Sequence, residues 1–177
     1  MNHSQSARIE ELIHAEEWPK ARTLIKAELR KKPKDHWLLS RLALTYYEER
    51  QYDRALQLDI KALQEAPYCP LAIWGYAGSL DMLNRGSEAL KVYKWLASWG
   101  EETLAYGDCG EGLRWARSLI ADCYYRIASI LEKKGQRKRA IAAFEEYLSR
   151  RQRGHRSIYS LRDVKSRYSL LLTKNKS

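Results

Sequence analysis

Histidines, cysteines and paired carboxylates are the side chains of this sequence that could support catalysis or hold a metal. The four histidines are dispersed, with no i, i+4 pair and no Cys-x-x-Cys motif, so their spacing does not indicate a zinc site. Neighbouring carboxylates such as Glu101 and Glu102 do not face each other on a helix, so they do not converge on one substrate atom. The stretch "GDCGEG" lacks the Lys-Ser/Thr of a phosphate-binding loop. The sequence therefore predicts no catalytic residue, no metal site and no cofactor.

Cys109 is the one candidate for a reactive thiol, because it lies among glycines in an expected loop. A nucleophile needs a base and an orienting group nearby, and the sequence indicates neither. A free surface cysteine is the simpler interpretation. Three cysteines are too few for a disulfide framework, and no signal peptide or membrane-spanning apolar run is evident. These features predict a reduced, cytoplasmic, soluble protein.

The positive charge is concentrated near the end of the chain. Residues 126–177 hold 15 Lys/Arg and 4 Asp/Glu, a net +11, whereas residues 1–125 hold 17 Lys/Arg and 18 Asp/Glu, a net −1. Such asymmetry is typical of a protein that binds an acidic partner, nucleic acid or an anionic surface. A solvated, arginine-rich surface explains it equally well.

An internal repeat determines the expected architecture. Ala21, Ala55 and Ala89 are 34 residues apart, and Ala140 follows Ala89 by 51, which is one period plus an insertion of 17. Small residues at this spacing suit places where two helices cross closely. An apolar i, i+3, i+4, i+7 stripe precedes two of these alanines, and it comprises Leu39, Leu42, Ala43 and Tyr46 in one copy and Tyr124, Ile127, Ala128 and Leu131 in the other.

The repeated unit resembles the tetratricopeptide repeat family. The family pattern is matched in the clearest copy by Leu39, Leu42, Ala43, Tyr46, Tyr52, Ala55, Ala62 and Pro67. The resemblance implies an all-α fold, a right-handed α-solenoid of antiparallel helix pairs whose concave face binds peptides or partner proteins. We expect one domain over residues 1–177, with repeats at about 2–35, 36–69, 70–103 and 121–154. We expect an insertion at about 99–112, most of which (about 99–111) forms a loop. A long helix from about Leu113 to Lys134 should follow it. A capping helix at about 156–173 would seal the stack, with Ile158, Leu161, Tyr168, Leu171 and Leu172 on one face.

The family resemblance also places a partner-binding groove on the first helix of each pair. Aromatic anchors with polar neighbours are a common means of gripping a peptide or helix. Alternatively, some of these rings pack beneath the insertion or the terminal helix, which would leave no open groove. The groove residues implied are Trp37, Arg41, Leu44, Tyr47, Trp74, Gly78, Tyr125 and Arg126.

The sequence thus predicts a non-catalytic scaffold or adaptor that binds a peptide or helical segment of a protein partner, with acidic partners favoured by the positive charge. The alternative is a module associated with RNA or other nucleic acid, in which Tyr159 and Tyr168 would stack on bases. Self-association through the edge of the array is a third option. The candidate anion-binding patch comprises Lys133, Lys134, Arg137, Lys138, Arg139, Arg150, Arg151 and Arg153.

Overall fold

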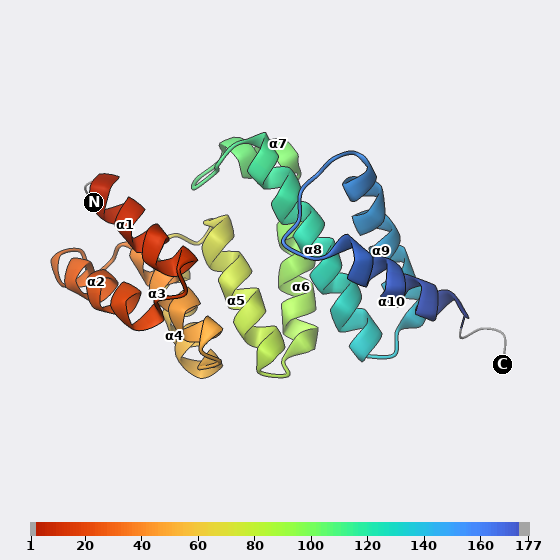
Figure 1. Cartoon of the computed structure of the whole chain (residues 1–177), viewed down its shortest axis with the longest axis horizontal. Helices are drawn as coiled ribbons and strands as arrows, with labels where there is room; N and C mark the ends of the chain where they lie inside the picture. Colours follow the sequence, from red (N-terminus) through yellow and green to blue (C-terminus); the bar gives the residue numbers. More distant parts are fainter. Residues whose placement is uncertain (1–2, 174–177) are drawn as a thin grey trace. The chain divides into compact units, whose positions relative to one another are not determined.

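Helices account for all the regular structure of the described residues. The computed structural model describes residues 3–173, which form ten α-helices and no strand (Figure 1). The all-α prediction is confirmed. The helices are α1 (His3–His14), α2 (Trp18–Lys31), α3 (His36–Glu48), α4 (Tyr52–Glu65), α5 (Pro70–Met82), α6 (Gly86–Ala97), α7 (Glu101–Tyr106), α8 (Leu113–Lys133), α9 (Arg137–Gln152) and α10 (Leu161–Thr173).

The chain divides after Arg85 into two compact units. In unit 1, each helix from α1 to α5 packs against the next, and α3 also contacts α5. In unit 2, α8 packs against α6, α7 and α9, and α10 packs against α9. This division falls between α5 and α6, inside the third predicted repeat. That residues 1–177 form a single domain therefore stays a prediction. Within residues 3–173 no helix has the length and apolar character needed to cross a membrane.

The same helix–turn–helix unit recurs at the spacing found in the sequence. The second helices of the pairs begin at Trp18, Tyr52, Gly86 and Arg137, which are 34, 34 and 51 residues apart. Two residues before each start, the backbone has a positive φ. The residues concerned are Glu16, Arg50, Asn84 and Gly135, with φ of 56°, 60°, 61° and 67°.

The buried surfaces of these helices follow the predicted pattern. Ala21, Ala55, Ala89 and Ala140 are all fully buried, as expected for small residues where helices cross closely. In α3, Leu39, Leu42 and Ala43 are buried, and in α8, Ile127, Ala128 and Leu131 are buried. Each unit therefore buries the apolar stripe that the repeat predicts.

The left-handed turn gives a prediction about stability. A non-glycine residue at positive φ is strained because its Cβ approaches its own backbone, and glycine avoids this cost. Gly135 already occupies the turn before α9, whereas Arg50 is an exposed side chain before α4. We expect Arg50→Gly to raise the free energy of unfolding by about 0.5–1 kcal/mol, and Gly135→Ala to lower it by a similar amount. Urea unfolding followed by circular dichroism measures both, and a destabilised Arg50→Gly would contradict the expectation.

Two boundaries differ from the sequence prediction. The insertion is not entirely a loop, because α7 forms within it before the glycine-containing turn that leads to α8. The terminal helix begins at Leu161, so the prediction that Ile158 lies on its apolar face is wrong. Ile158 is outside the helix and 74% exposed, whereas Val164, which the prediction omitted, is fully buried. The long helix at about 113–134 is confirmed as α8.

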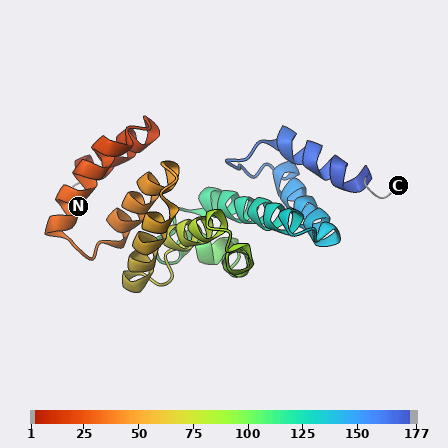
Figure 2. The ribbon, with the colours of Figure 1, turned by 90° about the horizontal axis from the view of Figure 1, so that it is seen from below.

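The connecting segment, residues 153–160, joins α9 to α10. It leaves the end of α9 and passes across α8 before α10 begins (Figures 1 and 2). Because α8 supplies the predicted groove residues of the last repeat, the path of this segment determines whether that groove is open.

Candidate functional site

Of the neighbouring carboxylates Glu101 and Glu102, Glu101 forms ion pairs. Glu101 Oε2 lies 2.7 Å from Arg117 Nε and Glu101 Oε1 lies 3.4 Å from Arg150 Nη1, whereas Glu102 is exposed. The hydrogen bond from Arg117 lowers the pKa of Glu101, and the charges of Arg117, His155 and Arg150 add to the effect. A carboxylate held ionised in this way is poorly suited to act as a general acid or base near neutral pH. This arrangement is typical of a structural ion-pair network.

In unit 1 the predicted groove residues lie on two helices in contact. Trp37, Arg41, Leu44 and Tyr47 belong to α3, and Trp74 and Gly78 belong to α5. Gly78 is buried, and the other five are half-buried. Trp37 and Leu44 pack against the buried cluster that contains Ile9, Leu12 and Ile13 of α1. The fold thus leaves the aromatic residues of α3 and α5, which we call the α3/α5 face, half-buried, and Trp37 rests on the buried cluster.

Two contacts fix the rings of α3. The Arg41 guanidinium lies over the Trp37 ring, 5.3 Å from its centre, and its Nε is 2.6 Å from Glu10 Oε1. Tyr47 meets Tyr52 edge to face, with ring centres 5.3 Å apart. These contacts lower the entropy lost when a ligand binds, because the rings are already held in place. Arg41 is paired with Glu10, so it offers a partner less positive charge than the sequence suggested.

In unit 2 the predicted groove residues already contact the chain itself. The Tyr125 ring stacks on Tyr159 of the connecting segment, with centres 3.7 Å apart and planes 13° from parallel. Arg126 donates from Nε to the hydroxyl of the buried Tyr93, at 3.2 Å. Tyr125 therefore fits the alternative expectation that some of the predicted groove rings pack beneath the terminal part of the chain.

Asp122 anchors the connecting segment to α8. Ser157 Oγ donates to Asp122 Oδ1 at 2.5 Å, and the Ile158 amide donates to the same oxygen at 3.3 Å. The Tyr147 hydroxyl donates to the Tyr159 carbonyl at 3.0 Å. Burial raises the pKa of Asp122 to about 6, although the hydrogen bonds from Ser157 and Ile158 act against the rise. A buried carboxylate thus binds one hydroxyl and one backbone amide of the connecting segment.

Arg167 of α10 is the second anchor, a role that the repeat pattern does not predict. Its guanidinium donates to the Tyr125 hydroxyl at 2.9 Å, to Ser129 Oγ at 3.0 Å and to the Glu132 carboxylate. It also lies over the Tyr125 ring, 5.3 Å from the centre. The only sequence signal was that Tyr125, Ser129 and Glu132 occupy groove positions of α8. Their partner Arg167 lies some 40 residues later in the sequence, at a position that no repeat of the chain predicts.

The candidate anion-binding patch is split between the two ends of α9. Lys133, Lys134, Arg137, Lys138 and Arg139 lie at its start, whereas Arg150, Arg151 and Arg153 lie at its other end. The rise of a helix separates Arg139 from Arg150 by roughly 16 Å. Several of these side chains bind other parts of unit 2. Arg137 donates to the carbonyls of Leu171 and Leu172, Lys134 to Ser87, Arg150 to Glu101 and Arg151 to the His155 carbonyl.

The two tyrosines assigned to base stacking are also engaged. Tyr159 stacks on Tyr125, and the Tyr168 hydroxyl donates to Glu145 Oε1 at 2.9 Å. Lys133, Lys138, Arg139 and Arg153 remain exposed. The structure therefore does not bring the predicted basic clusters and aromatic rings together as one surface.

The comparisons with known proteins agree with the repeat architecture. Residues 121–153 match the family model described as tetratricopeptide repeat. The structure of MamA 41-end from Desulfovibrio magneticus RS-1 is similar, with a TM-score of 0.65 and 14% identity over 98% of this chain and 96% of that one. A second MamA structure, the RS-1 ArsTM double mutant, gives a TM-score of 0.72 and 14% identity, covering 97% and 84% of the two chains. A third similar structure is that of TTC0263, a thermophilic TPR protein of Thermus thermophilus. Its TM-score is 0.51 at 16% identity, over 97% of this chain and 99% of that one.

At these identities the likeness to solved structures shows the fold. No curated protein matches the sequence significantly. The matched repeat lies on α8 and α9, whose turn at Gly135 has the positive φ found at the other three pairs. Residues 121–153 therefore match a tetratricopeptide repeat, and the chain shares over most of its length the helical-repeat fold of these solved structures.

Proposed function

We propose that the chain is a non-catalytic scaffold or adaptor, and that the α3/α5 face of unit 1 binds an extended or helical segment of a protein partner. The tetratricopeptide repeat fold supports a role in protein–protein interaction. The binding residues are the half-buried Trp37, Leu44, Tyr47 and Trp74. Trp37 and Tyr47 are held by neighbouring side chains, which favours recognition of a segment without rearrangement.

The binding of the connecting segment to α8 is the observation that carries this proposal. Tyr125 follows Trp74 by one period plus the insertion, so the two residues occupy equivalent positions of their repeats. At Tyr125 the equivalent face binds the connecting segment through ring stacking on Tyr159 and hydrogen bonds to Asp122. We infer that Trp74 stacks on a planar side chain of a partner segment in the same way.

Charge and location complete the proposal. The positive charge of residues 126–177 would raise the rate at which an acidic partner associates, with less effect on the affinity. A cytoplasmic location suits the three free cysteines, Cys69, Cys109 and Cys123. The nucleic-acid alternative has less support, because much of the basic patch and both candidate stacking rings bind the chain itself.

Substitution of Trp74 tests the groove. Peptides selected from a random library on the immobilised protein would be synthesised, and their dissociation constants measured by fluorescence anisotropy. We expect Trp74→Ala to weaken binding at least tenfold, about 1.4 kcal/mol or more, because a buried aromatic anchor is lost. Trp37→Ala should act in the same direction.

The matched control is Trp95→Ala, since Trp95 is 45% exposed on α6 in the other unit. Circular dichroism of each variant separates loss of binding from loss of fold. Peptides that keep their affinity for Trp74→Ala but lose it for Trp95→Ala would contradict the proposed site.

A further inference from the structure

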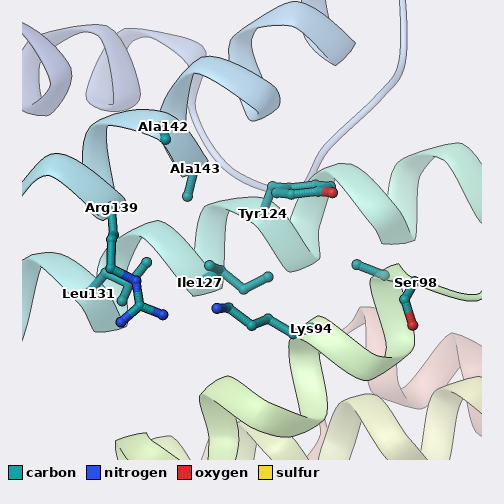
Figure 3. Close-up of a pocket in the computed structure, with 9 residues that line it drawn as sticks. Lys94, Ser98, Tyr124, Ile127, Leu131, Arg139, Ala142 and Ala143 are labelled. Carbon is teal, nitrogen blue, oxygen red and sulfur yellow. The ribbon is translucent and has the colours of Figure 1, made fainter. Parts of the chain in front are cut away.

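Unit 2 contains a pocket that is separate from the groove positions and from the connecting segment. It has a volume of about 400 Å³ and lies between α6, α8 and α9 (Figure 3). Ile127, Leu131 and Ala143 are buried and give it an apolar floor, and the half-buried Tyr124 closes one side. This volume is within the range of small-ligand sites and is large enough for one aromatic side chain.

Two cations line this pocket. Lys94 comes from α6 and Arg139 from α9, and their charged ends point toward each other across the opening (Figure 3). Arg139 donates to Gln136 Oε1 at 2.5 Å, but neither cation forms an ion pair with any residue between 3 and 173. Two like charges facing one apolar cavity favour an occupant that combines an apolar group with carboxylates.

The same unit displays a group of this kind at the end of α7. The acidic turn, residues 102–111, contains no Lys or Arg, and Glu102, Asp108 and Glu111 are all exposed. Tyr106 is 72% exposed, so its ring does not lie in the pocket of its own chain. Glu102 and Tyr106 are i, i+4 neighbours on α7, which places the carboxylate beside the ring.

The backbone holds the acidic turn in a closed shape. The Gly110 amide donates to the Gly107 carbonyl at 3.0 Å, and the Gly112 amide donates to the Ala105 carbonyl at 3.1 Å. A Cβ on Gly110 would lie 2.4 Å from the Ala105 carbonyl oxygen, so the turn closes only with glycine there. A preformed turn loses little entropy when it binds, which favours docking of its exposed ring.

We propose that the acidic turn of one molecule inserts Tyr106 into the pocket of a second copy, with its carboxylates facing Lys94 and Arg139. The ring would cover the apolar floor, and the unpaired charges of the two surfaces would neutralise each other. Because the turn and the pocket are different surfaces, the contact is head-to-tail and can continue from molecule to molecule. The contact area is small, so we expect a weak association, with a dissociation constant of about 10⁻⁴ M.

Analytical ultracentrifugation between about 5 and 500 µM tests the proposal. We expect the mean mass of the wild-type protein to rise with concentration. Tyr106→Ser should remove the ring, and Lys94→Glu/Arg139→Glu should reverse the charge of the pocket, each weakening association at least tenfold. The matched controls are Tyr68→Ser, an exposed tyrosine of unit 1, and Lys138→Glu, an exposed cation of α9, and both should associate like the wild type.

Mixing the two defective variants distinguishes this contact from other modes of self-association. The Tyr106→Ser protein keeps an intact pocket, and the pocket variant keeps an intact acidic turn. Their mixture should form a 1:1 dimer that grows no further. A wild-type protein that stays monomeric throughout, a mixture that stays monomeric, or variants that associate like the wild type would each overturn the proposal.

Discussion

Replacing Asp59 with asparagine is expected to stabilise the protein by about 3 kcal/mol more at pH 8 than at pH 5. Asp59 lies on α4, is only 2% exposed and accepts one hydrogen bond, from Ser79 Oγ at 2.8 Å. Burial raises the pKa of its carboxyl group from 3.8 to about 7, against the smaller opposing effect of that hydrogen bond. The folded chain therefore holds a proton that the unfolded chain releases above pH 4.

This difference in proton binding sets the direction of the pH dependence. Stability from Asp59 is fully present below the pKa of the unfolded state, and it is lost as the pH rises through about 7. Asparagine cannot ionise, so the variant lacks this loss. Urea unfolding at several pH values gives the free energies, and subtracting wild type from variant removes the contribution of Asp122, whose pKa is also raised.

Asp53→Asn is the matched control, because Asp53 is an exposed residue of the same helix. It should change stability by less than about 0.5 kcal/mol at either pH. If the stability difference between Asp59→Asn and the wild type is the same at pH 5 and pH 8, the expectation is contradicted, since the folded state would then not raise the pKa of Asp59.

The periodic part of the molecule could be predicted from the sequence because each repeat carries its own copy of the signal. Ala21, Ala55, Ala89 and Ala140 are fully buried, and the second helices begin at the predicted spacing. Ile25, Asp59 and Tyr93 share one position, four residues after the first three of these alanines, and all three are buried. Asp59 is thus the charged member of a buried position that the repeat otherwise fills with Ile25 and Tyr93.

The spacing did not predict what surrounds Asp59. A Cβ on Gly75 of α5 would lie 2.6 Å from Asp59 Oδ1, so the missing side chain of Gly75 makes room for the carboxylate. In the corresponding pair of unit 2, Arg126 donates to Tyr93. These pairs join neighbouring repeats, and they cannot be read from a pattern that describes one repeat at a time.

The candidate site was predictable only in part, for a similar reason. The positions on α3, α5 and α8 followed from the repeat, but residues 153–160 have no copy elsewhere in the chain. Whether α8 is covered depends on the contacts of Ser157, Tyr159 and Arg167 with residues some 35 to 40 positions earlier. No local pattern records contacts at that separation.

Substitution of Arg167 with alanine is expected to release the connecting segment from α8. Arg167 bonds to Tyr125, Ser129 and Glu132, and its removal leaves the partly buried Glu132 without a cation. A hydrogen bond that involves a charged group contributes about 1.5–3 kcal/mol. Because local opening controls amide exchange, hydrogen exchange at Ile158 and Tyr159 should become about 30- to 100-fold faster. Mass spectrometry of peptides that span residues 153–160 measures this change.

Arg162→Ala is the matched control for this release, because Arg162 is an exposed arginine on the same helix, α10. It should leave exchange at Ile158 unchanged, and neither variant should alter exchange in unit 1. The result bears directly on the proposed function. Release of the connecting segment would uncover Tyr125, which occupies the same repeat position as Trp74, and α8 would then have an open face for a partner. If Arg167→Ala leaves exchange at Ile158 and Tyr159 as slow as in the wild type, then Asp122 and the Tyr125–Tyr159 stack hold the segment without Arg167.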